Sequence, residues 1–180
     1  GLNSPFPEEY KKIWKVFMEN DDPMFVSEHR RSFDQEEEME NIIVSDADIT
    51  IYSISAARFN IIEAVQLLEK EGIRCNIVNI LWLKPLDLSE PMIHPLKQSK
   101  LGLVVDSGFE MAGASQSIAY ELMNKTGFPV KALGAEDRPV GSAERYKNTT
   151  PKPEKIAETI KELVNKKLKD KSNIHTPRAF

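Results

Sequence analysis

The sequence predicts an α/β fold, a three-layer α/β/α sandwich with a mainly parallel sheet of about five strands. Two observations support this prediction. Between residues 47 and 168, strand-length apolar runs alternate with longer stretches that have the apolar spacing of amphipathic helices. Parallel neighbours also require a crossover connection, which is usually a helix packed on the sheet. Repeated crossovers therefore predict helices on both faces.

The first 31 residues predict one helix and one short strand. The helix starts after two prolines, and its apolar face carries Tyr10, Ile13, Trp14 and Phe17. The apolar run Met24–Val26 predicts a strand that ends in a charged cluster at residues 28–31. Residues 32–46 are polar and acidic, and we expect a linker between domains. Its apolar anchor is Ile42, Ile43 and Val44.

Residues 47–168 are expected to form one domain of alternating strands and helices. Strands are predicted at 49–54, 73–81, 101–105 and 130–133. Helical stretches are predicted at 57–68, 91–98, 114–122 and 153–168, with Gly72 and Gly127 as stop signals. The lysine-rich residues 169–180 are expected to be a disordered tail.

Composition and charge argue against several functions. The net charge is −4 and the basic residues are scattered, so we expect no nucleic-acid partner. The apolar runs are too short to span a membrane, and the N-terminus lacks the order of a signal peptide. The single cysteine, Cys75, has no partner for a disulfide or a CxxC site. These features predict a location in the cytoplasm or an organelle matrix.

The familiar short motifs of catalysis and nucleotide binding are incomplete. Gly108 and Gly113 have the separation of P-loop glycines, but Ala114 stands where the phosphate-binding lysine is needed. The first strand of the domain is not followed by GxGxxG, and no serine lies in GxSxG. The three histidines are far apart and lack the spacing of metal ligands. We predict neither a nucleotide fingerprint nor a metal site.

Two groups of residues remain as candidate sites. Ligands of open α/β sheets bind outside the carboxyl ends of the strands. The candidates there, for a crevice or an interface, are Asp106, Ser107, Gly108, Gly113 and Asp137. The second group, Glu28, His29 and Arg30, directly follows the N-terminal strand. This group could face a crevice between domains or be a solvated strand end.

Four collinear segments lie within residues 23–165. They are Pro23-Met-Phe-Val-Ser-Glu-His-Arg-Arg31, the stretch from Asp48 to Leu83-Lys-Pro-Leu-Asp87, Leu103-Val-Val-Asp-Ser-Gly108, and Gly134-Ala-Glu-Asp-Arg-Pro139. In this order they resemble the beta subunits of pyruvate, branched-chain and acetoin dehydrogenases, and more distantly transketolase. Ser107 departs from the family's usual glutamate. The chain is identified as similar to the C-terminal domain of these thiamine diphosphate enzymes.

The resemblance implies that thiamine diphosphate and magnesium serve the full enzyme and are held by other domains, so this chain binds no cofactor alone and is inactive by itself. Its implied role is assembly, in a homo-oligomer or with missing cofactor-binding domains or an alpha subunit. In sugar-phosphate members the strand end matching Glu28, His29 and Arg30 borders the substrate channel, so these residues are expected at an active-site edge. The alternative is a stand-alone ligand-binding or regulatory α/β domain.

Overall fold

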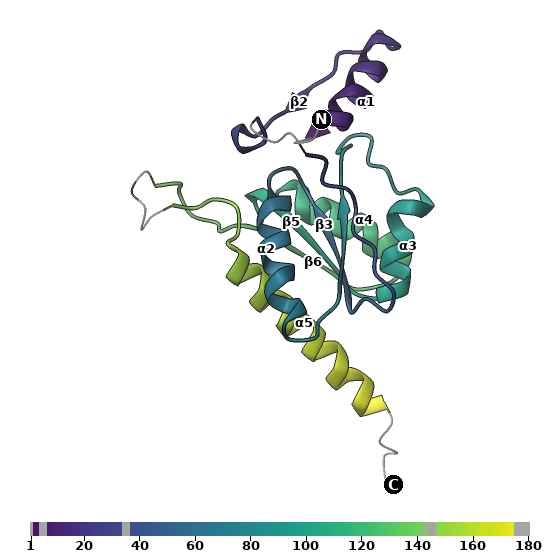
Figure 1. The fold of residues 1–180 in the computed structure, drawn as a ribbon, viewed down its shortest axis with the longest axis vertical. Helices are drawn as coiled ribbons and strands as arrows, with labels where there is room; N and C mark the ends of the chain where they lie inside the picture. The colour runs from purple at the N-terminus through teal and green to yellow at the C-terminus, as the bar shows by residue number, and fades with distance from the viewer. Residues whose placement is uncertain (1, 4–6, 34–36, 142, 144–146, 175–180) are drawn as a thin grey trace.

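The computed structural model describes residues 2–3, 7–33, 37–141, 143 and 147–174. The chain forms a small N-terminal unit, at the top of Figure 1, and a larger body below it. The unit consists of β1 (Leu2–Asn3), α1 (Pro7–Met18), β2 (Val26–Ser27) and the short 3-10 helix η1 (Arg30–Ser32). Strands β1 and β2 pair in parallel, so β1, α1 and β2 make one βαβ crossover.

The body is a four-stranded parallel sheet in the order β4-β3-β5-β6. Its elements are β3 (Ile49–Ser53), α2 (Ala57–Glu69), β4 (Cys75–Asn79), α3 (Glu90–Ser99), β5 (Gly102–Phe109), α4 (Ala114–Thr126), β6 (Val130–Ala135) and α5 (Pro153–Ile174). This confirms the predicted α/β fold class. The described part of the sheet has four strands, whereas about five were expected.

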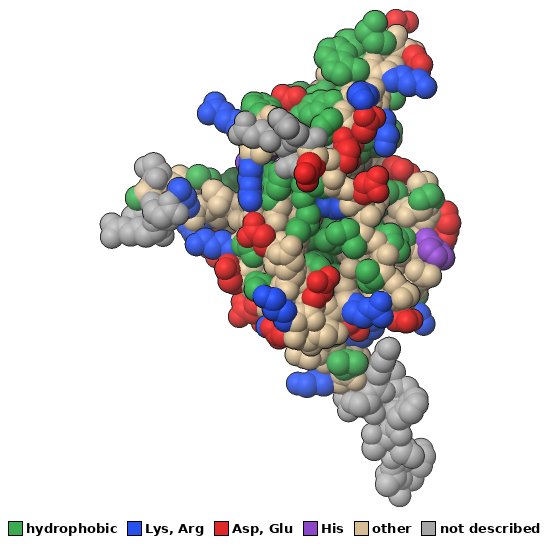
Figure 2. Space-filling model, viewed as in Figure 1, with side chains coloured by type: hydrophobic (Ala, Val, Ile, Leu, Met, Phe, Trp, Pro, Cys, Tyr) green, Lys and Arg blue, Asp and Glu red, His purple; other side chains and the backbone are tan. Residues whose placement is uncertain are grey.

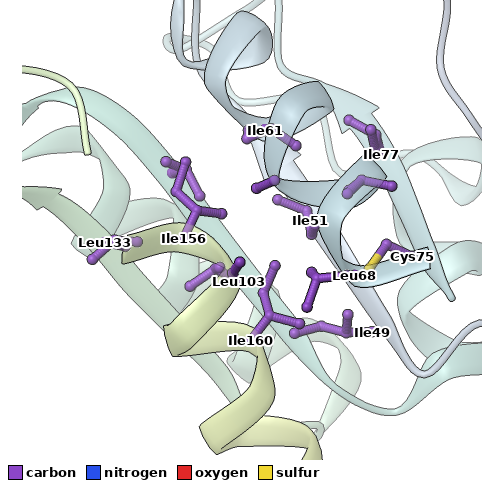
Figure 3. Close-up of a cluster of buried hydrophobic side chains, with 14 of the residues drawn as sticks. Ile49, Ile51, Ile61, Leu68, Cys75, Ile77, Leu103, Leu133, Ile156 and Ile160 are labelled. Carbon is purple, nitrogen blue, oxygen red and sulfur yellow. The ribbon is translucent and has the colours of Figure 1, made fainter. Parts of the chain in front are cut away.

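Helices cover both faces of the sheet because its strands are apolar on both sides. Ile51 and Leu103 face α2 and α5, where they join the larger buried cluster (Figure 3). Tyr52 and Val104, their chain neighbours, face α3 and α4 in the second cluster. This alternation follows from the two-residue period of a strand. Every residue of β3 and β4 is buried, as is typical of parallel strands covered on both faces.

Two boundaries differ from those predicted. Strand β5 continues to Phe109 rather than ending at Val105, with a register irregularity before Phe109 pairs with Ala135. Helix α5 continues to Ile174. Residues 169–174 are thus helical where a disordered tail was expected, and 175–180 lie outside the described residues. Lys167 contributes to this extension by donating to the carbonyl oxygens of Asp48 and Ser99.

The predicted linker lies along the open side of β4. Ile42 and Ile77 exchange two backbone hydrogen bonds, of 2.9 and 2.7 Å, as an antiparallel bridge. The side chain of Asn76 also accepts from the Val44 amide at 2.9 Å. An unpaired strand edge would expose backbone donors and acceptors. These contacts instead cover part of the β4 edge with the chain's own residues.

Candidate functional site

The carboxyl ends of β5 and β6 are joined by close backbone contacts that require glycine. A Cβ atom on Gly113 would lie 1.9 Å from the Phe109 carbonyl oxygen. A Cβ on Gly134 would lie 2.6 Å from the Gly108 oxygen and 2.8 Å from the Glu110 nitrogen. No side chain fits at either distance. Gly113 therefore has a structural role at the entrance to α4, where the sequence suggested a crevice.

Asp106 is buried within β5, at 8% exposure. Burial raises the pKa of its carboxyl group, and hydrogen bonds from the backbone amides of Gly108 and Ser107 partly oppose this shift. Gly108 itself is exposed. The hydroxyl of Ser107 accepts a 2.9 Å hydrogen bond from Thr150, just before α5. Asp106 thus stabilises the end of β5 by local bonds, and Ser107 ties it to the segment before α5.

A cleft of about 770 Å³ opens beside the ends of β5 and β6, between the starts of α4 and α5. Of the five crevice candidates, Asp137 lines this cleft, whereas Asp106, Ser107, Gly108 and Gly113 do not. Further lining residues that the sequence did not single out include Glu110, Gln116, Asn148, Thr150 and Lys152. Together with Asp137 they come from three separate segments, so no single motif could reveal them.

Asn148 organises the mouth of this cleft. Its side-chain nitrogen donates to the carbonyl oxygens of Glu136 and Arg138 at 2.7 and 2.8 Å, and its side-chain oxygen accepts from the Glu136 amide at 2.9 Å. Arg138 pairs with the Glu136 carboxylate at 2.5 Å. The polar groups of Asn148 are used to fix the loop that contains Asp137.

Glu28, His29 and Arg30 lie at the surface of the N-terminal unit, directly after β2. His29 precedes η1, and its Nδ1 accepts from the Arg31 amide at 3.1 Å. Arg31 contacts the body, where its guanidinium donates to Asn60 at 2.8 Å and lies 4.6 Å from the centre of the Phe59 ring. Arg31, which was not among the candidates, is therefore the residue of this cluster that reaches α2.

An apolar groove of about 240 Å³ runs along the N-terminal unit. Its lining residues are Tyr10, Ile13, Trp14, Phe17, Met24, Val26 and Glu28, so it includes the whole predicted apolar face of α1. Burial, followed by the nearby Glu28 carboxylate, raises the pKa of the Tyr10 phenol. Glu28 is thus the member of the Glu28–Arg30 cluster that faces the groove.

The aromatic side chains of this region remain exposed. Trp14 is 60% exposed, Phe17 42% and Phe25 74%. The rings of Trp14 and Phe17 meet edge to face with centroids 5.6 Å apart. Apolar side chains accordingly gather on the surface of this unit at the top of Figure 2. A patch of this kind typically marks a contact surface.

Within the described residues, no three side chains of His, Cys, Asp or Glu are grouped so that they could hold a metal ion. Among the same residues, none of the helices has the length and apolar character needed to cross a membrane.

Comparison with known proteins identifies the family. Residues 40–156 match the family model described as transketolase, C-terminal domain. The chain is 25% identical over 177 residues to the pyruvate dehydrogenase E1 component subunit beta of Porphyra purpurea, covering 88% of this chain and 53% of that protein. The corresponding subunit of Rickettsia felis is 23% identical over 172 residues, covering 87% and 52%.

A solved structure has the same fold. It is titled a split gene transketolase, inactive beta4 tetramer, and matches with a TM-score of 0.68 and 20% identity over 91% of this chain and 56% of that one. The chain spans about half the length of these relatives. The matched model covers the linker anchor, the whole sheet and the start of α5. This chain belongs to the family of transketolase C-terminal domains, and it is related to the beta subunits of pyruvate dehydrogenase.

Proposed function

We propose that this chain is the assembly part of a thiamine diphosphate-dependent enzyme of the 2-oxoacid dehydrogenase beta type. In this proposal other domains or subunits hold the cofactor and its magnesium, and the ylid of the cofactor supplies the carbanion chemistry. In the full enzyme the N-terminal unit contacts the cofactor-binding parts, and in their absence the same surface of the unit contacts a second copy of this chain. By itself it is inactive.

The observation that carries this proposal is the exposed groove of the N-terminal unit. A two-stranded sheet is marginal alone, and parallel sheets are normally covered on both faces. Here Trp14 and Phe17 flank a groove that the described residues leave open. A second protein surface would bury these rings. Glu28 would then lie at the contact, which is why we place it, ahead of His29 and Arg30, at the active-site edge.

Replacing both Trp14 and Phe17 by serine is expected to reduce self-association. For the parent chain, in the absence of other subunits, a second copy is the proposed cover, so light scattering should give a mass of at least twice 20.4 kDa. The W14S/F17S variant should be monomeric because burying the two serine side chains contributes almost no hydrophobic free energy to association. Tyr120→Ser is the matched control, since Tyr120 is 61% exposed on α4 of the body. A compact parent monomer would contradict the proposal.

Calorimetric titration with thiamine diphosphate and magnesium is expected to give no binding heat with the isolated chain. The reason is that the proposal assigns the cofactor and its magnesium to other domains, and the described residues include no group of three His, Cys, Asp or Glu side chains placed to hold a metal ion. A complete beta subunit mixed with its alpha subunit is the positive control. Micromolar binding by this chain alone would contradict the proposal that other domains or subunits hold the cofactor.

The cleft that Asp137 lines favours the second candidate, a ligand-binding or regulatory domain. A screen of nucleotides and sugar phosphates by thermal unfolding distinguishes the two. A ligand that binds the folded state raises the melting temperature. A clear rise that is lost in Asp137→Ala would favour the second candidate.

A further inference from the structure

Arg58 is buried in a place that is unfavourable for a cation. Its side chain is 0% exposed, although arginine is almost never fully buried unless it is paired. It also lies in the first turn of α2, where the helix dipole disfavours positive charge. The contacts that hold Arg58 must therefore offset both the loss of hydration and this dipole.

The side chain of Arg58 contacts the backbone of the linker, residues 32–46. Its Nη2 donates to the carbonyl oxygen of Met39 at 3.1 Å and to that of Glu40. The next residue, Asn41, accepts a 2.7 Å hydrogen bond from the Asn79 amide at the end of β4. The antiparallel bridge of Ile42 follows immediately. Arg58 thus fixes the point at which the linker reaches the sheet.

The N-terminal unit reaches the same point through Glu9 of α1. The Glu9 carboxylate accepts a 2.5 Å hydrogen bond from the side-chain nitrogen of Asn79. Burial lowers the pKa of Arg58 to about 10, and the negative charge of Glu9 opposes that shift. Arg58 is charged at neutral pH, and Glu9 is the carboxylate whose charge compensates it. Helix α1, the linker and the carboxyl end of β4 therefore meet at one polar junction.

This junction is incompletely satisfied. Nε and Nη1 of Arg58 and Oδ1 of Asn79 are buried without a hydrogen-bond partner. Unpaired buried polar groups cost free energy that the existing bonds must offset. The two hydrophobic clusters of the body, as described, contain no residue before Ile49. The N-terminal unit thus adds no side chain to these buried clusters, and its hydrogen bonds to Asn60 and Asn79 are polar contacts, which open more easily than an apolar core.

We propose that Arg58, Glu9 and Asn79 form a latch that holds the N-terminal unit and the linker against the carboxyl ends of β3 and β4. Opening the latch releases the unit while the body stays folded. Arg31, with its exposed contacts to α2, is a secondary attachment. The latch goes beyond the proposed assembly role, because it sets the placement of the unit whichever partner covers the groove.

Hydrogen exchange of the full chain, followed by mass spectrometry, tests the latch. Arg58→Met removes the charge and the donors, and Glu9→Gln removes the compensating charge at nearly constant size. In Arg58→Met, exchange of linker residues 39–44 is expected to rise at least about tenfold. A smaller rise, about threefold or more, is expected in Glu9→Gln because Asn79 can still bond an amide. Exchange in β3 and β5 should stay unchanged.

The control is Lys161→Met, which breaks the exposed ion pair with Glu71 within the body and should leave residues 39–44 unaffected. Unchanged linker exchange in both junction variants would overturn the latch. An equal rise in the linker, β3 and β5 would also overturn it, because Arg58 would then support the whole fold. Should Arg58→Met fail to fold, Glu9→Gln alone decides, by the same comparison. Exchange is independent of the mass measurement that tests assembly.

Discussion

Replacing Leu103 by alanine is expected to lower the free energy of unfolding by about 2–5 kcal/mol, the range for truncating a fully buried leucine. Leu103 is 0% exposed in β5, and its side chain lies between the sheet and α5 (Figure 3). The cavity would open in the cluster that α2, α5 and all four strands of the body sheet share. Urea unfolding followed by circular dichroism measures the loss.

Leu67→Ala is the matched control for this substitution. Leu67 lies on α2 but is 40% exposed, so its truncation should cost less than about 1 kcal/mol. A Leu103→Ala variant as stable as Leu67→Ala would show that α5 does not pack on β5 as described. A Leu103→Ala loss with an unchanged denaturant slope would confirm that the same surface is buried in the variant.

The body was predictable because its strands are short apolar runs bounded by helix signals. The five residues of β3, Ile49–Ser53, are all buried, and the sequence presents them as an apolar run with only Thr50 and Ser53 polar. The end of β5 was not predictable in the same way. Within residues 106–109 the pairing with β6 is limited to Phe109 after a register irregularity, and close glycine contacts join the two strands there. Such contacts leave no hydrophobic period.

The burial of Arg58 agrees with its helical spacing but not with the usual surface position of arginine. Arg58 lies three residues before Ile61 and seven before Val65, both of which are buried, so the period alone places it on the buried stripe. The general preference of arginine for the surface argues the opposite. Arg58 can be buried because the linker carbonyl oxygens of Met39 and Glu40 accept hydrogen bonds from its guanidinium group. That contact joins residues about twenty apart and has no signature in local sequence.

The candidate sites also differ in whether local sequence spacing could predict them. The apolar face of α1 was read correctly, because its helical period brings Tyr10, Ile13, Trp14 and Phe17 into one groove. Glu28, which directly follows β2, lines the same groove. The cleft beside Asp137 instead depends on loops after β5 and β6 and on the start of α5. Sites assembled from distant loops need the fold before their members can be named.

Replacing Gly134 by alanine is expected to lower the free energy of unfolding by about 3 kcal/mol, the upper part of the range for overpacking. The added methyl group would meet backbone atoms of Gly108 and Glu110 at 2.6–2.8 Å. Backbone cannot rotate away as a flexible side chain can, so β5 and β6 must separate at their carboxyl ends. The hydrogen bond from the Glu110 amide to the Ala135 carbonyl oxygen, 2.9 Å long, should be lost with this separation.

Gly127→Ala separates this steric effect from backbone strain. Gly127 has φ +75° but nothing within 4 Å of its Cβ position, so alanine there should cost about 1 kcal/mol through the left-handed conformation alone. Gly134→Ala should therefore be clearly the less stable of the two, and amide exchange should rise first around residues 108–111. If both variants lose equal stability, the close approach of β5 and β6 is wrong. If Gly134→Ala loses more, the close approach of β5 and β6 at Gly134 is confirmed. Gly134 and Glu110 both line the cleft with Asp137, so this contact also fixes one wall of the cleft.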